Sequence, residues 1–254
     1  MVPVLVGIGD AKKIAYPLFC QPHDEKIFKQ IEKREIAVHE ELIPKQVLLL
    51  GYRALCSLTF QLTRLSLIDT ILEAAKKVGY QHSLNEPERY ARLHRIMAKD
   101  IMVSVYKRYE QIRKSGDYSQ LGYALYMVNV PPCIAATYSL IPVDDEDAKA
   151  IVNGTLHLKP EDAVSFTFLP HEPLTNSICV ISWLKDSRRA RRFMVLNRIN
   201  ELSEKERQDL FFHFAFESST VYISPQWWNL LSEEKRVEYT MIHCNARRDH
   251  AELI

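Results

Sequence analysis

The segment Val164-Ser165-Phe166-Thr167-Phe168 alternates apolar and hydroxyl side chains. This period of two is typical of a half-buried β-strand. A second apolar run, Ile178 to Trp183, follows after a connection that starts at Pro170. Because a short connection places successive strands side by side, this pair of runs predicts an antiparallel sheet.

Two further strands are predicted before this pair, and helices before those. Tyr123 to Val130 and Cys133 to Ile141 are short runs rich in β-branched and aromatic residues, which favour strands. The preceding sequence has helical periodicity, with one helix opening at Pro44 and another running from Asn85 to a terminating Gly116. The first half of the chain is therefore expected to be helical.

Two helices are predicted to close the chain. Ser203-Glu204-Lys205-Glu206 fits a capping box, and Ser224-Pro225 suits the start of a second helix. Helices before and after a central antiparallel sheet predict an α+β fold. We expect a single domain over residues 1–254, with a helical part over about 1–117 and the sheet plus closing helices over about 118–254.

Composition narrows the classes of function. The 254 residues carry 33 basic and 32 acidic side chains, so the net charge of +1 gives no global attraction for nucleic acid or acidic lipid. None of the seven glycines forms a phosphate-binding loop motif, which argues against nucleotide cofactors of that type. The apolar start, Met1 to Gly9, is too short to span a membrane and is expected to be a strand or a packed arm.

Five cysteines are widely spaced and form no Cys-x-x-Cys pair. Such usage predicts reduced thiols rather than a disulfide framework, and hence a cytoplasmic protein.

The segment Phe19-Cys20-Gln21-Pro22-His23-Asp24 is the main candidate for chemistry, with Glu32 about two helical turns further on. Cys20, His23 and Asp24 are side chains that bind zinc, although a metal site needs a further ligand. A Cys20–His23 nucleophile pair is a second interpretation. The structural alternative places Cys20 in the core, uses Asp24 as the N-cap of a helix to about Arg34, and lets His23 hold the turn.

A second candidate region is the arginine run after the Ile178 strand, whose members are Arg188, Arg189, Arg191 and Arg192. With Trp227 as a stacking side chain, these residues are candidates for nucleic-acid binding. A solvated cluster in a turn between strands is the alternative. Because the run is short and the net charge is near zero, we expect binding to generic nucleic acid to be weak.

Arg53 lies in the most apolar predicted helix. An unpaired guanidinium there is costly to desolvate, so we expect Arg53 to be partly buried and paired with a carboxylate, Glu217 or Glu32.

Three blocks of residues together resemble a group of bacterial proteins of unknown activity. The blocks are FCxxHDxxxFxxIE from Phe19, Leu50-Gly51-Tyr52-Arg53-Ala54-Leu55-Cys56, and Phe216-Glu217 with Ser224-Pro225-x-Trp227-Trp228. The resemblance covers about Val6 to Leu231 and implies a bacterial protein with the fold of that group. Members often carry a zinc-finger-like segment before the first block, and the sequence ahead of Phe19 holds none.

No complete catalytic set is visible, so the sequence favours a cytoplasmic binding or regulatory module without catalytic activity. We expect a protein partner, no membrane insertion and no required cofactor. The alternative is a metal-dependent hydrolase, such as a nuclease, that uses Cys20, His23, Asp24 and Glu32, with zinc as the metal.

Overall fold

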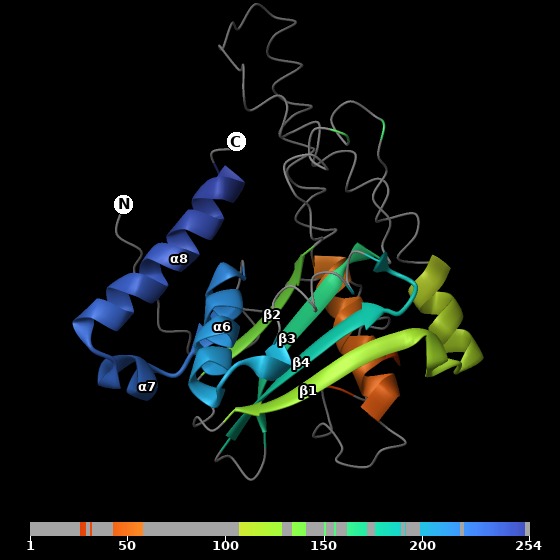
Figure 1. The fold of residues 1–254 in the computed structure, drawn as a ribbon, viewed down its shortest axis with the longest axis horizontal. Coiled ribbons are helices and arrows are strands. Elements are labelled where there is room, and N and C mark those ends of the chain that lie inside the picture. The colour runs from red at the N-terminus through yellow and green to blue at the C-terminus, as the bar shows by residue number, and fades with distance from the viewer. Residues whose placement is uncertain are drawn as a thin grey trace, which may run out of the picture.

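The computed structural model of the chain describes residues 26–28, 31, 43–57, 107–128, 134–140, 150, 155, 162–171, 176–188, 191, 199–218 and 221–251. Within them, a five-stranded antiparallel sheet lies between helices on both faces. In Figure 1 the helix of residues 43–57 is orange and lies behind the sheet, while α6 lies in front of it. The predicted α+β fold is confirmed.

The sheet contains the four predicted strands and one that was not predicted. Its strands are β1 (Leu121–Val128), β2 (Ile134–Leu140), β3 (Val164–His171), β4 (Asn176–Leu184) and β5 (Val221–Ile223). Their spatial order is β1-β4-β3-β2-β5, and each neighbouring pair is antiparallel. β5 has only three residues, too few for an alternating pattern to reveal it.

The expectation of a half-buried β3 was wrong, because both of its faces are covered. Ser165 and Thr167 are each only 2% exposed, and Phe166 on the opposite side is 4% exposed. The hydroxyl residues face helical segments of the first half of the chain, not water. A strand between two layers loses the solvent-facing side that the alternation suggested.

One side of the sheet, which we call the serine face, carries three serines directly opposite one another on β2, β3 and β4. Ser139 pairs with Ser165, and Ser165 pairs with Ser182 in the strand register. The Ser139 and Ser165 hydroxyls are 2.8 Å apart, and the Ser165 hydroxyl donates to the Gly51 carbonyl at 3.5 Å. A Cβ on Gly51 would lie 2.6 Å from the Ser182 Oγ, so glycine lets the helix of residues 43–57 approach the sheet closely.

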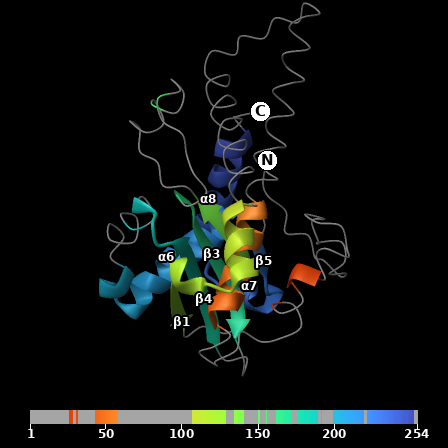
Figure 2. The ribbon, with the colours of Figure 1, turned by 90° about the vertical axis from the view of Figure 1, so that its right-hand side faces the viewer.

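That helix is buried almost all round. Val47, Leu48 and Leu55 are among its enclosed side chains, which is typical of a helix inside the protein. Residues 107–115 form a helix beside it, and the Tyr52 and Tyr109 rings stack with centroids 5.9 Å apart. Figure 2 shows the orange and yellow-green helices next to each other.

The predicted stop at Gly116 is confirmed. Gly116 has a positive φ of 69°, and its amide donates to the Ile112 carbonyl at 3.0 Å, which closes the helix of residues 107–115. A short 3-10 helix, η2 (Tyr118–Gln120), then leads into β1.

The opposite side of the sheet, which we call the aromatic face, packs against α6 (Glu204–Glu217), which follows the 3-10 helix η4 (Ile199–Glu201). Phe166 meets Phe214 at 4.5 Å between ring centroids, and Phe168 meets Phe212 at 5.7 Å. The predicted capping box is present, with Ser203 and Glu206 bonded reciprocally.

Three helices, not two, close the chain. α7 (Pro225–Leu230) starts as predicted, with Pro225 in its first turn and Ser224 as N-cap. It ends after six residues because Leu231 adopts an extended backbone, and α8 (Glu233–Ala251) begins anew. Ser232 accepts a hydrogen bond from the Lys235 amide at 3.2 Å, which caps the new helix.

Several predictions fall partly or wholly outside the described residues. Residues 26–28 and 31 are helical, and Phe28 is fully buried, as expected for the first predicted helix. Its predicted cap at Asp24, the arm of residues 1–9 and the helix over residues 85–106 lie outside the described part.

Candidate functional site

The last two helices are held to the body by an aromatic cluster. Phe216 of α6 stacks on Tyr239 of α8 with ring centroids 4.5 Å apart. Phe212 meets the Trp227 and Tyr239 rings edge-on, and Trp228 packs against Phe216 at 6.2 Å. Trp227, a candidate for stacking on nucleic-acid bases, is therefore partly buried among other rings and serves packing first.

Beyond this cluster lies a surface of α8 that we call the C-terminal face, formed by Glu233, Glu234, Val237 and Met241, with Leu230 exposed at the end of the preceding helix α7. Leu230 is 84% exposed at the end of α7, and Val237 and Met241 are 55% and 53% exposed on α8. Val237 and Met241 are four residues apart and so lie on the same side of the helix. These residues were not predicted as functional, although apolar residues at this spacing in an otherwise polar helix were a visible signal.

The charge exposed on the C-terminal face is negative. Glu233 and Glu234 are exposed in the first turn of α8, where the helix dipole favours carboxylates, and neither forms an ion pair among the described residues. Lys235 is drawn away from them: its Nζ lies 2.8 Å from a Glu238 carboxylate oxygen and 5.6 Å from the centre of the Tyr239 ring. The bond to Glu238 raises the pKa of Lys235.

A second pair of exposed apolar side chains lies on β1, at the other edge of the sheet. Tyr123 is 39% exposed and Met127 is 52% exposed. β1 pairs with β4 on one side, and no described strand pairs with its other side. Met127 thus matches Met241 in residue type and exposure but lies in a different element.

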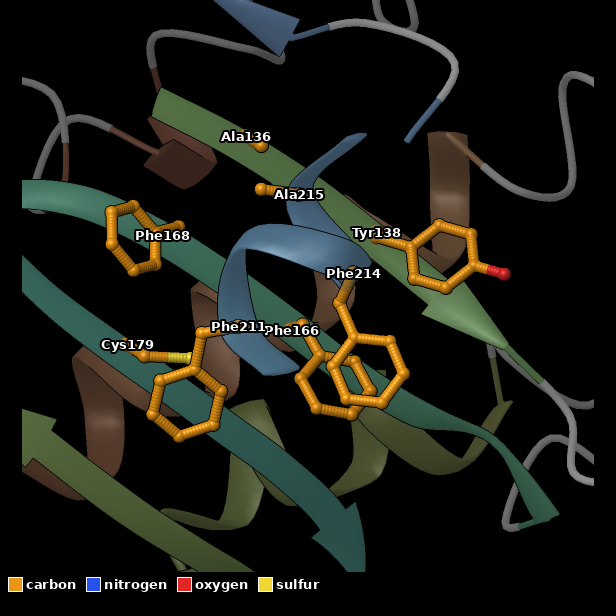
Figure 3. Close-up of a pocket in the computed structure, with 8 residues that line it drawn as sticks. All are labelled: Ala136, Tyr138, Phe166, Phe168, Cys179, Phe211, Phe214 and Ala215. Atoms are coloured by element: carbon orange, nitrogen blue, oxygen red, sulfur yellow. The ribbon is translucent and has the colours of Figure 1, made fainter. Parts of the chain in front are cut away.

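A cavity of about 10 Å³ lies between α6 and the aromatic face. Figure 3 shows the Phe166 and Phe214 rings close together beside it, with the Tyr138 hydroxyl pointing away from them. Its lining is apolar, and its volume is at the lower limit for one water molecule. The cavity is a gap in the packing and is too small to hold a ligand.

The predicted pair between Arg53 and Glu217 is absent. The Glu217 carboxylate lies 3.0 Å from the His213 Nε2, one turn back along α6 on the aromatic face. Arg53 is partly buried as predicted, but it belongs to the helix on the serine face, where its guanidinium lies 5.3 Å from the centre of the Phe28 ring. The sheet separates the two residues. The alternative partner, Glu32, lies outside the described residues.

Glu217, which pairs with His213 on α6, also lies close enough to Tyr138 of β2 for its charge to act on the phenol. Burial, and secondarily the negative charge of Glu217, raises the pKa of the Tyr138 phenol. A raised phenol pKa keeps Tyr138 protonated at neutral pH, so it offers no activated phenolate.

The arginine run is only partly described. Arg188 and Arg191 are exposed and helical, and the Arg191 Nε donates to the Ser187 carbonyl at 3.3 Å. The sequence suggested a turn between strands here, but the backbone at Arg188 and Arg191 is helical. The Arg191 amide also donates a hydrogen bond to the Ser187 carbonyl. Arg189 and Arg192 lie outside the described residues, so the predicted four-arginine patch is not assembled by the described ones.

The main candidates for metal binding and catalysis, Cys20, His23, Asp24 and Glu32, also lie outside the described residues. In the part of the chain that the structure does describe, no group of three or more His, Cys, Asp or Glu side chains is placed to hold a metal ion. His243 uses its Nδ1 in a 2.9 Å hydrogen bond with the Phe216 carbonyl.

Two described cysteines are structural. Burial raises the pKa of the Cys56 thiol to about 12, although a hydrogen bond with Tyr52 acts in the opposite direction. Burial likewise raises the pKa of the Cys179 thiol. Because the thiolate is the nucleophile, neither residue is suited to covalent or redox chemistry.

None of the helices in the described segments is both long and apolar enough to cross a bilayer. The chain matches no protein-family model, no curated protein and no solved structure at a significant level.

Proposed function

We propose that this chain is a non-catalytic binding or regulatory module that binds a partner protein through its C-terminal face. The supporting observation is the group of three exposed apolar side chains, Leu230, Val237 and Met241, within twelve positions of the sequence. Apolar residues scattered singly on a surface are ordinary, but residues grouped on one helix side are typical of contact sites. The aromatic cluster behind them fixes α7 and α8 in place.

We place this module in the bacterial cytoplasm. The widely spaced cysteines support a reducing compartment, and the resemblance of the three sequence blocks supports a bacterial source. The proposed role requires no cofactor.

Site-specific photo-crosslinking in cells tests the proposal. A photoreactive amino acid replaces Met241 in the full chain, and the same amino acid replaces Met127 in a matched control with nearly equal exposure. We expect a discrete heavier product from position 241 that disappears after Val237→Glu. Equal products from both positions, or none from position 241, would refute the C-terminal face as the binding surface.

A metal-dependent hydrolase is the second proposal, favoured by the Cys20-x-x-His23-Asp24 motif. Zinc held there would supply a nucleophile by lowering the pKa of a bound water molecule. Elemental analysis of the purified full chain tests it: the proposal requires about one zinc per chain that is lost in Cys20→Ser but kept in Cys244→Ser. Zinc far below this ratio in the unmodified chain contradicts the proposal.

For nucleic acid, we infer weak binding only. Arg188 and Arg191 give a small local positive charge on a chain whose net charge is +1. Titration of labelled single- and double-stranded oligonucleotides at about 150 mM salt checks this inference. Tight binding that survives alanine at Arg188, Arg189, Arg191 and Arg192 would place a nucleic-acid enzyme ahead of the binding module.

A further inference from the structure

We infer that the partner segment is a basic amphipathic helix, with apolar residues one turn apart and Lys or Arg beside them; this inference rests on the proposed function. The negative charge of the C-terminal face favours a basic partner. Its apolar centre is formed by Val237 and Met241, and Glu233 and Glu234 are exposed one turn before Val237 on the same side of α8. Glu238, one turn before Met241, is paired with Lys235. A partner with acidic flanks would be repelled there.

Among the described side chains of α8, Lys235 and Arg236 do not neutralise the two carboxylates of Glu233 and Glu234. Helical spacing puts Glu233 and Glu234 within about 60° of Val237 around the α8 axis, at about 100° per residue. By the same spacing Lys235 lies on the far side, where it contacts Glu238 and the Tyr239 ring. Arg236 is partly buried, its Nε is enclosed, and helical spacing puts it about 100° from Val237 around the axis. The exposed side therefore combines apolar contacts with two uncompensated carboxylates.

Helix geometry sets the form of the ligand. Val237 and Met241 are separated by about 6 Å along the α8 axis, at about 1.5 Å per residue. A partner helix places its own residues i and i+4 at the same interval, so its side chains interdigitate with these two. Its basic residues then lie beside Glu233 and Glu234.

Peptide binding to the full chain tests the partner chemistry. The probe is a fluorescent two-heptad helical peptide of leucine and lysine, and the control peptide has glutamate in place of every lysine. We expect the lysine peptide to bind and the glutamate peptide to bind at least about tenfold more weakly. Similar affinity for both peptides would overturn the inference.

Variants locate the site. Met241→Glu should weaken binding of the lysine peptide by about tenfold or more, as the loss of a central contact does. Met127→Glu adds the same charge at an equally exposed methionine and should leave affinity unchanged, so a loss in that variant overturns the location. Glu233→Gln with Glu234→Gln should remove most of the salt dependence of binding, and a salt dependence unchanged by both substitutions contradicts the role of these carboxylates. Circular dichroism confirms that each variant is folded.

The two proposals fail differently. A crosslink at position 241 without any preference for the lysine peptide leaves the binding face in place and removes the basic partner. The alternative ligand of the C-terminal face is a second copy of this chain. Sedimentation equilibrium of the chain alone detects such self-association. Self-association that Met241→Glu abolishes would replace the basic helix with this chain itself.

Discussion

The serine face and the aromatic face of the sheet are built from different side chains, although β3 contributes to both. On β3, Ser165 and Thr167 point to the serine face, whereas Phe166 and Phe168 point to the aromatic face. On the serine face, small hydroxyl groups and Gly51 bring a helix backbone close to the sheet. On the aromatic face, large rings hold α6 in place.

The helices on the two faces are therefore held to the sheet in different ways. On the serine face, the helix can lie close to the sheet only because glycine has no side chain, so an added methyl group disrupts the contact. Ring packing depends on the presence of large buried surfaces, so removal of a ring disrupts it. The aromatic face also extends into the cluster that positions α7 and α8, which links the core to the proposed binding surface.

The largest effect is expected from Phe216→Ala on the aromatic side. It removes a fully buried ring that stacks on Tyr239 and packs against Trp228. Loss of a buried phenylalanine costs about 3–5 kcal/mol of unfolding free energy. Urea denaturation followed by tryptophan fluorescence measures it, with Met127→Ala as an exposed control. A loss of less than about 1 kcal/mol would show that the cluster does not secure these helices.

A smaller loss of unfolding free energy is expected from Gly51→Ala on the serine face. The new Cβ would meet the Ser182 Oγ at 2.6 Å. Overpacking costs about 1–3 kcal/mol, and the better helix propensity of alanine returns about 1 kcal/mol, so the net loss is up to about 2 kcal/mol.

Whether Gly51→Ala destabilises or stabilises the fold should depend on Ser182. In a Ser182→Ala background the obstructing oxygen is gone, and Gly51→Ala should be neutral or stabilising. A double-mutant cycle of unfolding free energies measures this coupling. Equal costs of Gly51→Ala in both backgrounds would disprove the close contact as the cause.

Thiol labelling compares the opening of the two faces, because each core contains one cysteine. Cys56 lies in the core of the serine face and Cys179 in that of the aromatic face, on the interior strand β4. Exposing Cys179 requires α6, which the buried rings hold, to separate from the aromatic face, whereas Cys56 needs its own helix to separate from the small hydroxyl side chains of the serine face. We expect Cys56 to react at least about tenfold faster in native conditions, a difference of about 1.4 kcal/mol.

The labelling experiment uses the full chain with the other three cysteines, Cys20, Cys133 and Cys244, changed to serine. Mass spectrometry follows each site separately. Equal rates would mean that both faces open together in one global unfolding step.

The smallest effect concerns the ion pair between Glu110 and Arg113 on the helix of residues 107–115. Two hydrogen bonds of 2.7 and 2.8 Å join the side chains, and the bond to Arg113 lowers the pKa of Glu110. Because the folded pKa lies below the unfolded one, the pair stabilises the fold above the unfolded pKa, and this stability is lost as pH falls through the folded pKa.

Glu110→Gln should therefore cost less than about 1 kcal/mol at neutral pH, as is usual for partly exposed pairs. The cost should vanish in acid. Urea titrations of both proteins between about pH 7 and pH 2, on either side of the usual glutamate pKa, give the difference. A cost that grows in acid contradicts this assignment.

Local patterns in the sequence were enough to predict much of the fold. The apolar runs at β1 to β4, the capping box at Ser203 and the stop at Gly116 each depend on neighbouring residues, so they appear without knowledge of distant contacts. The restart of α8 after Leu231 was missed because the signals of Ser224-Pro225 and Ser232 lie within one helix length of each other. The candidate site on Cys20, His23 and Asp24 stays a prediction outside the described residues.

Local preferences of the amino acids specify which segments become strands and helices, because backbone preference and capping act over a few residues. Which layer covers each face of the sheet depends instead on packing between distant parts of the chain. Ser165 and Thr167 look solvent-facing in sequence, yet helix packing against the serine face encloses them. Met241 looks like a core residue at helical spacing, yet it remains exposed because the aromatic cluster anchors α8 by its opposite side. Burial depends on contacts between residues far apart in the chain, and the period of a pattern cannot specify them.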